Sequence, residues 1–90
     1  PTAMAITAKN LLDVKRCDLL FAYLPHVSIG TLEEIGWAVG LGKPIVILSS
    51  RDDILKHPVL MATVPFLYDT RKGGFKQAME TINGLYGVYV

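Results

Sequence analysis

The residues best suited to chemistry follow the loop Pro25–Gly30, where an apolar run gives way to a helical pattern. They are Ser28, Gly30, Thr31 and Glu34. The free N–H groups and positive dipole end of a helix start favour anions, including phosphate. The same dipole helps to keep a carboxylate in the first turn ionised, as a nucleophile requires. The spacing therefore predicts a ligand site at this helix start.

Each of these residues also has a structural interpretation. Thr31-Leu-Glu-Glu34 fits a capping box, in which the glutamate bonds back to the N–H of the cap residue. Ser28 fits an ordinary loop or capping serine. Glu33 points about 100° away from Glu34 around a helix, so we expect it on the solvated surface. The spacing alone leaves both interpretations open.

Four more polar residues are weaker candidates. Asp13 is expected to be a solvated helix carboxylate, and Cys17 to be buried. Asp18 opens the apolar run, about 20 Å from its far end at the rise of a strand, so a structural role is expected. His26 in the loop is expected to be solvated. None of them forms a metal-ligand cluster or a Ser-His-Asp arrangement with the others.

A strand–helix–strand unit must position these residues. Asp18–Leu24 is continuously apolar after its first residue, which predicts a strand buried on both faces with Tyr23 in the core. Thr31–Leu41 has the apolar spacing of a helix, and Trp37 lies off its apolar stripe, which suggests a partner contact. Ile45–Leu48 is a second buried strand. Two strands joined by a helix imply a right-handed crossover and a parallel sheet.

The flanking segments extend this unit. The first seven residues are expected to be irregular, followed by a helix from Thr7 or Lys9 to Arg16. A short helix over 59–62, a third strand over Phe66–Tyr68 and an amphipathic helix over Phe75–Tyr86 complete the prediction. The expected fold is a three-stranded parallel α/β unit with helices on its faces.

Length, net charge and composition limit the classes of protein to which the chain can belong. The chain has 90 residues, a net charge of +1 and 51% hydrophobic residues, which fits one globular domain without a nucleic-acid or acidic-membrane partner. A single cysteine excludes an intrachain disulfide and suits a reducing compartment. No apolar run is long enough to span a bilayer, and the first residues lack the pattern of a signal peptide. The expected location is the cytoplasm.

The segment from Asp18 to Pro44 carries a more specific pattern. The strand opened by Asp18 is followed by Ser28-Ile-Gly-Thr-Leu-Glu-Glu34-Ile-Gly-Trp-Ala and then by Gly-Lys-Pro44. This resembles the core of the nucleoside 2-deoxyribosyltransferase family, whose pattern is a strand opened by Asp, a small loop, G-T-x-x-E-[IL]-G-x-A and G-K-P. The resemblance implies one domain, complete or partial, over residues 1–90. It also implies a Rossmann/flavodoxin-like parallel sheet with flanking helices, without a counterpart of the family's first strand before Ile6.

The resemblance implies a role for the glutamate. In this family, the glutamate before Ile-Gly attacks the anomeric carbon of the sugar, a role that falls on Glu34. Members that hydrolyse nucleoside 5′-monophosphates resemble this sequence in carrying serine at the position of Ser28, where base-exchanging members commonly carry aspartate. The resemblance thus implies that Ser28, with Gly30 and Thr31, binds phosphate or sugar.

Two further positions take roles from the resemblance. Asn10 stands where many members have an aspartate that bonds the sugar or helps to protonate the leaving base. Asparagine can still orient the sugar, but it cannot act as an acid. Asp13, one turn along the predicted helix, is an alternative that could substitute for the missing aspartate, against its interpretation as a solvated carboxylate. His57 resembles a segment from which a neighbouring subunit contacts the phosphate in some members.

The predicted function is cleavage of the N-glycosidic bond of a nucleoside or nucleoside 5′-monophosphate through a covalent glycosyl-Glu34 intermediate. Either hydrolysis or transfer of the sugar to another base completes the reaction. The resemblance implies no cofactor and no metal, and a homo-oligomer, dimeric or larger, with a shared active site. The alternative is a catalytically inactive nucleotide-binding module or fragment, which Asn10 and the missing first strand favour.

Overall fold

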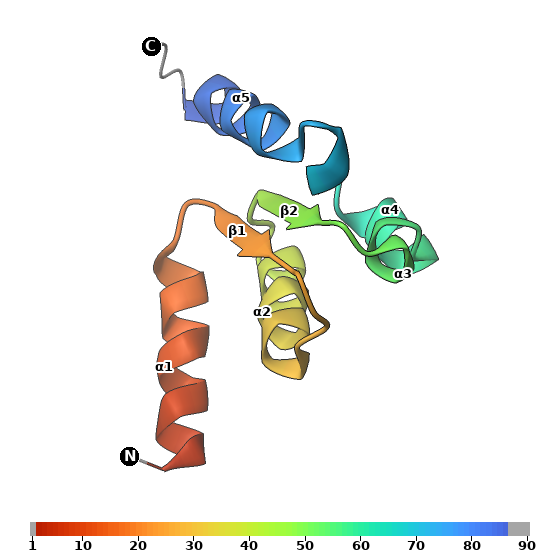
Figure 1. The fold of residues 1–90 in the computed structure, drawn as a ribbon. Coiled ribbons are helices and arrows are strands. Elements are labelled where there is room, and N and C mark those ends of the chain that lie inside the picture. Colours follow the sequence, from red (N-terminus) through yellow and green to blue (C-terminus); the bar gives the residue numbers. More distant parts are fainter. Residues whose placement is uncertain (1, 87–90) are drawn as a thin grey trace.

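A parallel sheet of three strands, in the order β1-β2-β3, forms the centre of the structure. The structure is a computed structural model that describes residues 2–86. In chain order the elements are α1 (Ala3–Arg16), β1 (Leu20–Tyr23), α2 (Ile29–Gly40), β2 (Ile45–Ser49), α3 (Asp52–Leu55), α4 (Pro58–Thr63), β3 (Phe66–Asp69), the 3-10 turn η1 (Thr70–Lys72) and α5 (Gly74–Tyr86). Figure 1 shows α1 and α2 on one side of the sheet and α5 on the other. The predicted α/β fold with a parallel sheet and flanking helices is confirmed.

Two clusters of apolar side chains hold the helices to the two faces of the sheet. The larger lies under α1, α2 and the α3–α4 segment and consists of Val14, Ala22, Leu24, Ile35, Ala38, Ile45, Ile47, Ile54 and Val64. The smaller lies under α5 and consists of Val46, Leu48 and Ala78. Alternate residues of β2 point to opposite clusters, so this strand is buried along its whole length. Burial on both faces explains why β2 is an unbroken apolar run.

The first strand differs from the prediction on one face. Ala22 is buried, but Phe21 and Tyr23 remain 42% and 53% exposed, so the prediction of a strand buried on both faces is wrong. The reason is that α5 packs over β2 and β3 and leaves the same face of β1 largely open. Tyr23 is therefore not a core residue, and its ring lies 5.8 Å from that of Phe75.

The first helix is longer than the sequence suggested. The expectation of an irregular start is wrong, because Thr2 caps α1 by accepting a hydrogen bond from the N–H of Ala5 at 3.1 Å. Pro1, part of that expectation, lies outside the described residues. Residues 2–19 contain no strand, which agrees with the absence of a counterpart of the family's first strand in this part of the chain.

The remaining elements follow the predicted order. Gly42 ends the α2 region with a left-handed φ of 69°, a conformation that favours glycine after a helix. Pro58 opens α4 at its first turn, as proposed. The predicted third strand and last helix are confirmed as β3 and α5. No helix in the described part of the chain is long and apolar enough to cross a bilayer.

Candidate functional site

Two of the predicted site residues, Asn10 and Glu34, line the same hollow between α1 and α2. Its volume is about 220 Å³, and its other lining residues are Asp13, Val14, Cys17 and Leu20. The two helices pack directly against each other, so a residue on α1 can face one on α2. The hollow combines apolar side chains with amide and carboxyl groups from two separate helices. We call Asn10, Asp13 and Glu34 the hollow cluster.

The start of α2 decides the position of Glu34. The helix begins at Ile29, with Ser28 as its N-cap, so Glu34 lies in the second turn rather than the first. The capping-box interpretation is therefore wrong, because Thr31 is already inside the helix and donates its N–H to Ser28 Oγ at 3.4 Å. The expected support from the helix dipole also weakens, since that effect is confined to the first turn. Glu34 is half-buried, and its carboxylate makes no hydrogen bond with any of residues 2–86.

The other wall of the hollow is one face of α1. Asn10, Asp13 and Cys17 follow the i, i+3, i+7 spacing that brings side chains to the same side of a helix. Within the described residues, the side-chain amide of Asn10 has no hydrogen-bond partner. Asp13 accepts a hydrogen bond from Lys9 Nζ at 2.8 Å, and the thiol of Cys17 donates to the carbonyl of Val14 at 3.0 Å. Cys17 is partly exposed, so the expectation of a buried cysteine is wrong.

Three predicted residues lie at the start of α2 and not in the hollow. Ser28 and Gly30 are exposed, and Thr31 is half-buried. A Cβ at Gly30 would have only Ser28 Oγ at 3.9 Å as a neighbour, so packing does not require a glycine there. The exposed turn leaves the N–H groups at the helix start accessible, as binding of an anion requires.

His57 lines a different hollow of about 380 Å³, together with Val27 and Leu32. Leu32 and Glu34 are separated by about 200° around a helix, so the two hollows lie on opposite sides of α2. The N–H of Val59 donates to His57 Nδ1 at 3.2 Å, which leaves Nε2 as the nitrogen free to contact a ligand. His57 and Glu34 of one chain therefore line different hollows.

The residues weighed as weaker candidates fall in several places. His26 is exposed, as expected, and Asp18, for which a structural role was expected, is exposed as well. Trp37 is half-buried and packs against the larger apolar cluster. Sequence reasoning missed Leu20 as part of the hollow because the residue belongs to an apolar strand. Cys17 was also missed, although its helical spacing from Asn10 was a usable signal.

Comparison with known proteins identifies the family. The sequence profile described as nucleoside 2-deoxyribosyltransferase matches residues 1–83. The chain belongs to this family. Among solved structures, it is similar to the CMP N-glycosidase BcmB of Clostridium botulinum, with 28% sequence identity and a TM-score of 0.59. The match covers 77% of this chain and 58% of the glycosidase, so the chain spans less than two thirds of the length of that enzyme.

A comparison with curated proteins gave no match. The family assignment confirms the resemblance seen in the sequence. Nucleosides and nucleotides are the small molecules on which this family acts.

Proposed function

We propose that this chain cleaves the N-glycosidic bond of a nucleoside or nucleoside 5′-monophosphate, with Glu34 as the nucleophile. The observation that carries the proposal is the shared hollow in a member of this family. The side chains of Glu34 and Asn10 both line it and have no hydrogen-bond partner among residues 2–86. A carboxylate free of internal hydrogen bonds keeps its lone pairs for a reacting carbon. The similarity to an enzyme titled a CMP N-glycosidase adds support for a nucleotide substrate.

The reaction takes two displacements. First, an oxygen of Glu34 attacks the anomeric carbon while the bond from this carbon to the base nitrogen breaks. The electron pair of that bond leaves with the base, which takes up a proton, and a glycosyl ester of Glu34 remains. A water oxygen or a nitrogen of a second base then attacks the same carbon. The ester bond returns its electron pair to Glu34, and the attacking group loses its proton to solvent.

Asn10 orients the sugar in this proposal and does not protonate the base. Its amide donates and accepts hydrogen bonds but carries no acidic proton. The departing base therefore takes its proton from water, and we expect slower turnover than an aspartate at this position would support. The position of Asn10 across the hollow from Glu34 supports its contact with the bound sugar.

The start of α2 binds the phosphate of a monophosphate substrate in this proposal. Ser28, Gly30 and Thr31 are the residues assigned to it, since a hydroxyl, an exposed glycine and free helix N–H groups suit an anion. The serine at position 28 favours hydrolysis of nucleoside 5′-monophosphates over base exchange, because the members that hydrolyse these substrates resemble this sequence in carrying serine there. Its capping bond to Thr31 is long at 3.4 Å, which leaves the hydroxyl able to change partner.

The proposed enzyme is a homo-oligomer whose active sites are shared. The hollow of about 220 Å³ is below the roughly 300–1,000 Å³ of pockets that enclose a drug-sized ligand, so further groups must complete the site. His57 lies away from Glu34 of its own chain, and we assign it to the substrate of a neighbouring copy. The free thiol of Cys17 suits a cytoplasmic location, which is part of the same proposal.

A second candidate function is nucleotide binding without turnover. The observation that favours it is Asn10, which removes the acid that many members place at this position. Such a module binds nucleotide and gains melting temperature from the ligand, but it releases no base. Replacing Glu34 would then change neither binding nor the lack of turnover.

The deciding experiment incubates the protein with nucleosides and 5′-monophosphates, with and without an acceptor base, and follows free base and exchanged nucleoside by chromatography. Base release that Glu34→Ala abolishes and Glu33→Ala leaves intact supports the proposal. A new nucleoside in the presence of acceptor indicates transfer, whereas free sugar or sugar phosphate indicates hydrolysis. Failure to release base from any substrate, with a nucleotide still raising the melting temperature, would leave the binding module.

A further inference from the structure

The hollow contains a second carboxylate, Asp13, that the proposed reaction does not use. It lies on the same face of α1 as Asn10 and lines the hollow together with Glu34. Its side chain is 54% exposed, so solvent and ligand both reach it. We propose that Asp13 is a sugar-binding residue, whose carboxylate accepts a hydrogen bond from a ring hydroxyl of the substrate.

The partner of Asp13 determines what its carboxylate can do. Lys9 Nζ contacts Oδ2 at 2.8 Å in an i, i+4 ion pair, and no other group among residues 2–86 bonds the carboxylate. Carboxylate oxygens accept hydrogen bonds, so Asp13 is a suitable acceptor for an O–H group. Oδ1 is the oxygen left for this contact.

The surroundings of Asp13 favour a sugar over a base or a phosphate. The side chains of Val14 and Leu20 give the hollow an apolar wall against which the C–H groups of a furanose can pack. A phosphate next to Asp13 and Glu34 would meet two like charges. A furanose instead offers hydroxyl donors, and bonds to sugar hydroxyls strengthen when the anomeric carbon gains positive charge. The volume of about 220 Å³ suits one ring of a nucleoside.

This inference rests on the proposed function in one respect, namely that the ligand of the hollow is the sugar of a nucleoside. It adds a residue that determines which sugar is bound. A carboxylate that binds one hydroxyl discriminates against a sugar that lacks this hydroxyl. A lone pair of the carboxylate then stays unpaired in the complex. Asp13 thus makes the enzyme sensitive to the hydroxyls of the ring.

The test is a cycle that pairs a side-chain change with a substrate change. Wild type and Asp13→Asn are compared on a ribonucleoside 5′-monophosphate and on its 2′-deoxy, 3′-deoxy and 2′,3′-dideoxy forms. We expect Asp13→Asn to lower kcat/KM about tenfold to a hundredfold on the ribonucleotide, as for a hydrogen bond to a charged group. The loss should disappear for the substrate that lacks the contacted hydroxyl, which also identifies the hydroxyl. An equal loss on all four substrates, or no loss on any, overturns the proposal.

Two controls separate this inference from the proposed function. Glu33→Gln removes a carboxylate from α2 outside the hollow and should leave all four values unchanged. The same four ligands are also titrated against Glu34→Ala and Glu34→Ala/Asp13→Asn by calorimetry. If wild type releases no base but Asp13→Asn weakens binding in a hydroxyl-dependent way, the glycosidase proposal fails and the assignment of Asp13 stands. If base is released and neither cycle depends on a hydroxyl, the glycosidase stands and the assignment of Asp13 fails.

Discussion

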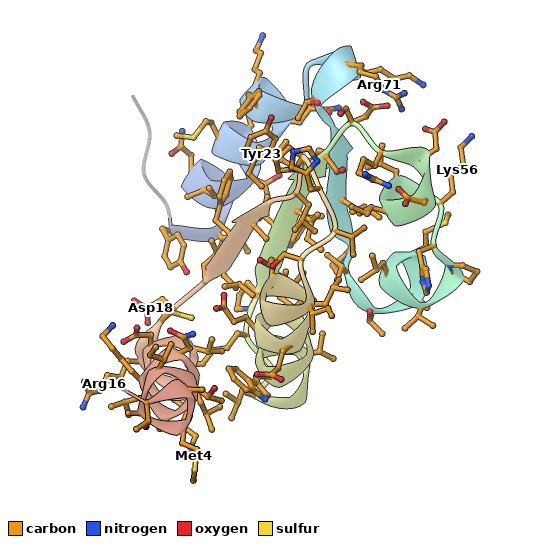
Figure 2. All side chains as sticks on the ribbon, turned by 60° about the horizontal axis from the view of Figure 1, so that its bottom comes forward. Met4, Arg16, Asp18, Tyr23, Lys56 and Arg71 are labelled. Atoms are coloured by element: carbon orange, nitrogen blue, oxygen red, sulfur yellow. The ribbon has the colours of Figure 1, made fainter. Side chains whose placement is uncertain are left out.

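Two groups of polar side chains lie at opposite ends of the molecule and differ in what their atoms bind. The hollow cluster of Asn10, Asp13 and Glu34 joins α1 and α2 with no hydrogen bond among its members. The second group, which we call the Arg71 cluster, consists of Asp52, Asp69 and Arg71 beside the end of β3. Figure 2 places Arg71 on the side of the molecule away from Arg16 and Met4 of α1.

The members of the Arg71 cluster form hydrogen bonds with one another. Arg71 Nη2 lies 2.7 Å from Asp52 Oδ1 and 2.9 Å from Asp69 Oδ2, and its Nε donates to Asp69 Oδ1 at 2.9 Å. These bonds from the guanidinium are the main reason that the pKa of each carboxyl lies below its usual value. A hollow of about 600 Å³ adjoins this cluster, larger than the one at Glu34. Unused hydrogen-bonding capacity, rather than the size of a hollow, therefore marks the candidate site.

The largest expected effect is at Glu34. Glu34→Gln keeps the shape of the side chain but removes the nucleophilic charge, so base release should fall by about a thousandfold or more. The melting temperature should change little, since Glu34 has no internal hydrogen bond among the described residues to lose. Single-turnover chromatography measures the rate, and Glu33→Gln on the same helix is the matched control. Comparable activity in the two variants would remove Glu34 from the mechanism.

The next largest effect should be a gain at Asn10. Asn10→Asp supplies a carboxyl group that can protonate the leaving base, and we expect base release to rise by about tenfold to a hundredfold below neutral pH. The gain should decline as pH rises and the new group ionises. Initial rates from pH 4.5 to 8 measure it, and Asn83→Asp on α5 controls for the added charge. A rate unaffected by Asn10→Asp at every pH would show that the base is not protonated from this wall of the hollow.

Sequence patterns predicted the sheet well because the apolar run of β2 and the helix stop at Gly42 are local signals. The exposed face of β1 was not predictable in this way, because it depends on where α5 packs. The arrangement of the site residues also depends on packing, and local signals predicted it only in part. The motif predicted Glu34, but Ser28 caps the helix by accepting a hydrogen bond from the N–H of Thr31. The helix therefore begins at Ile29, and Glu34 lies in its second turn. That Glu34 and Asn10 line one hollow depends on how α1 packs against α2, which no spacing within either helix reveals.

A smaller effect, on stability alone, is expected in the Arg71 cluster. Arg71→Met removes the contacts to Asp52 and Asp69 from an exposed position, where ion pairs contribute little. We expect the melting temperature to fall by about 1–5 °C, with kcat/KM within about twofold of wild type. Calorimetry and the base-release assay measure the two quantities. A large loss of activity with an unchanged melting temperature would instead place substrate beside the Arg71 cluster.

The smallest expected effect is a change in how the melting temperature of Arg71→Met depends on pH. The folded-state pKa values of Asp52 and Asp69 lie below those of the unfolded chain, so their contribution to stability is present above the unfolded value of about 4. It is lost as pH falls through the lower folded-state values. Arg71→Met should therefore flatten the fall in melting temperature between about pH 4 and pH 2. Some slope should remain, because hydrogen bonds from Arg51 also lower the pKa of Asp53.

The wild-type curve of melting temperature against pH is the reference for this measurement. Parallel curves for wild type and Arg71→Met would instead mean that the Asp52–Arg71–Asp69 contacts do not persist in solution. The carboxylates at both ends of the molecule would then be equally free, and unused bonding capacity would no longer distinguish the hollow cluster from the rest of the surface.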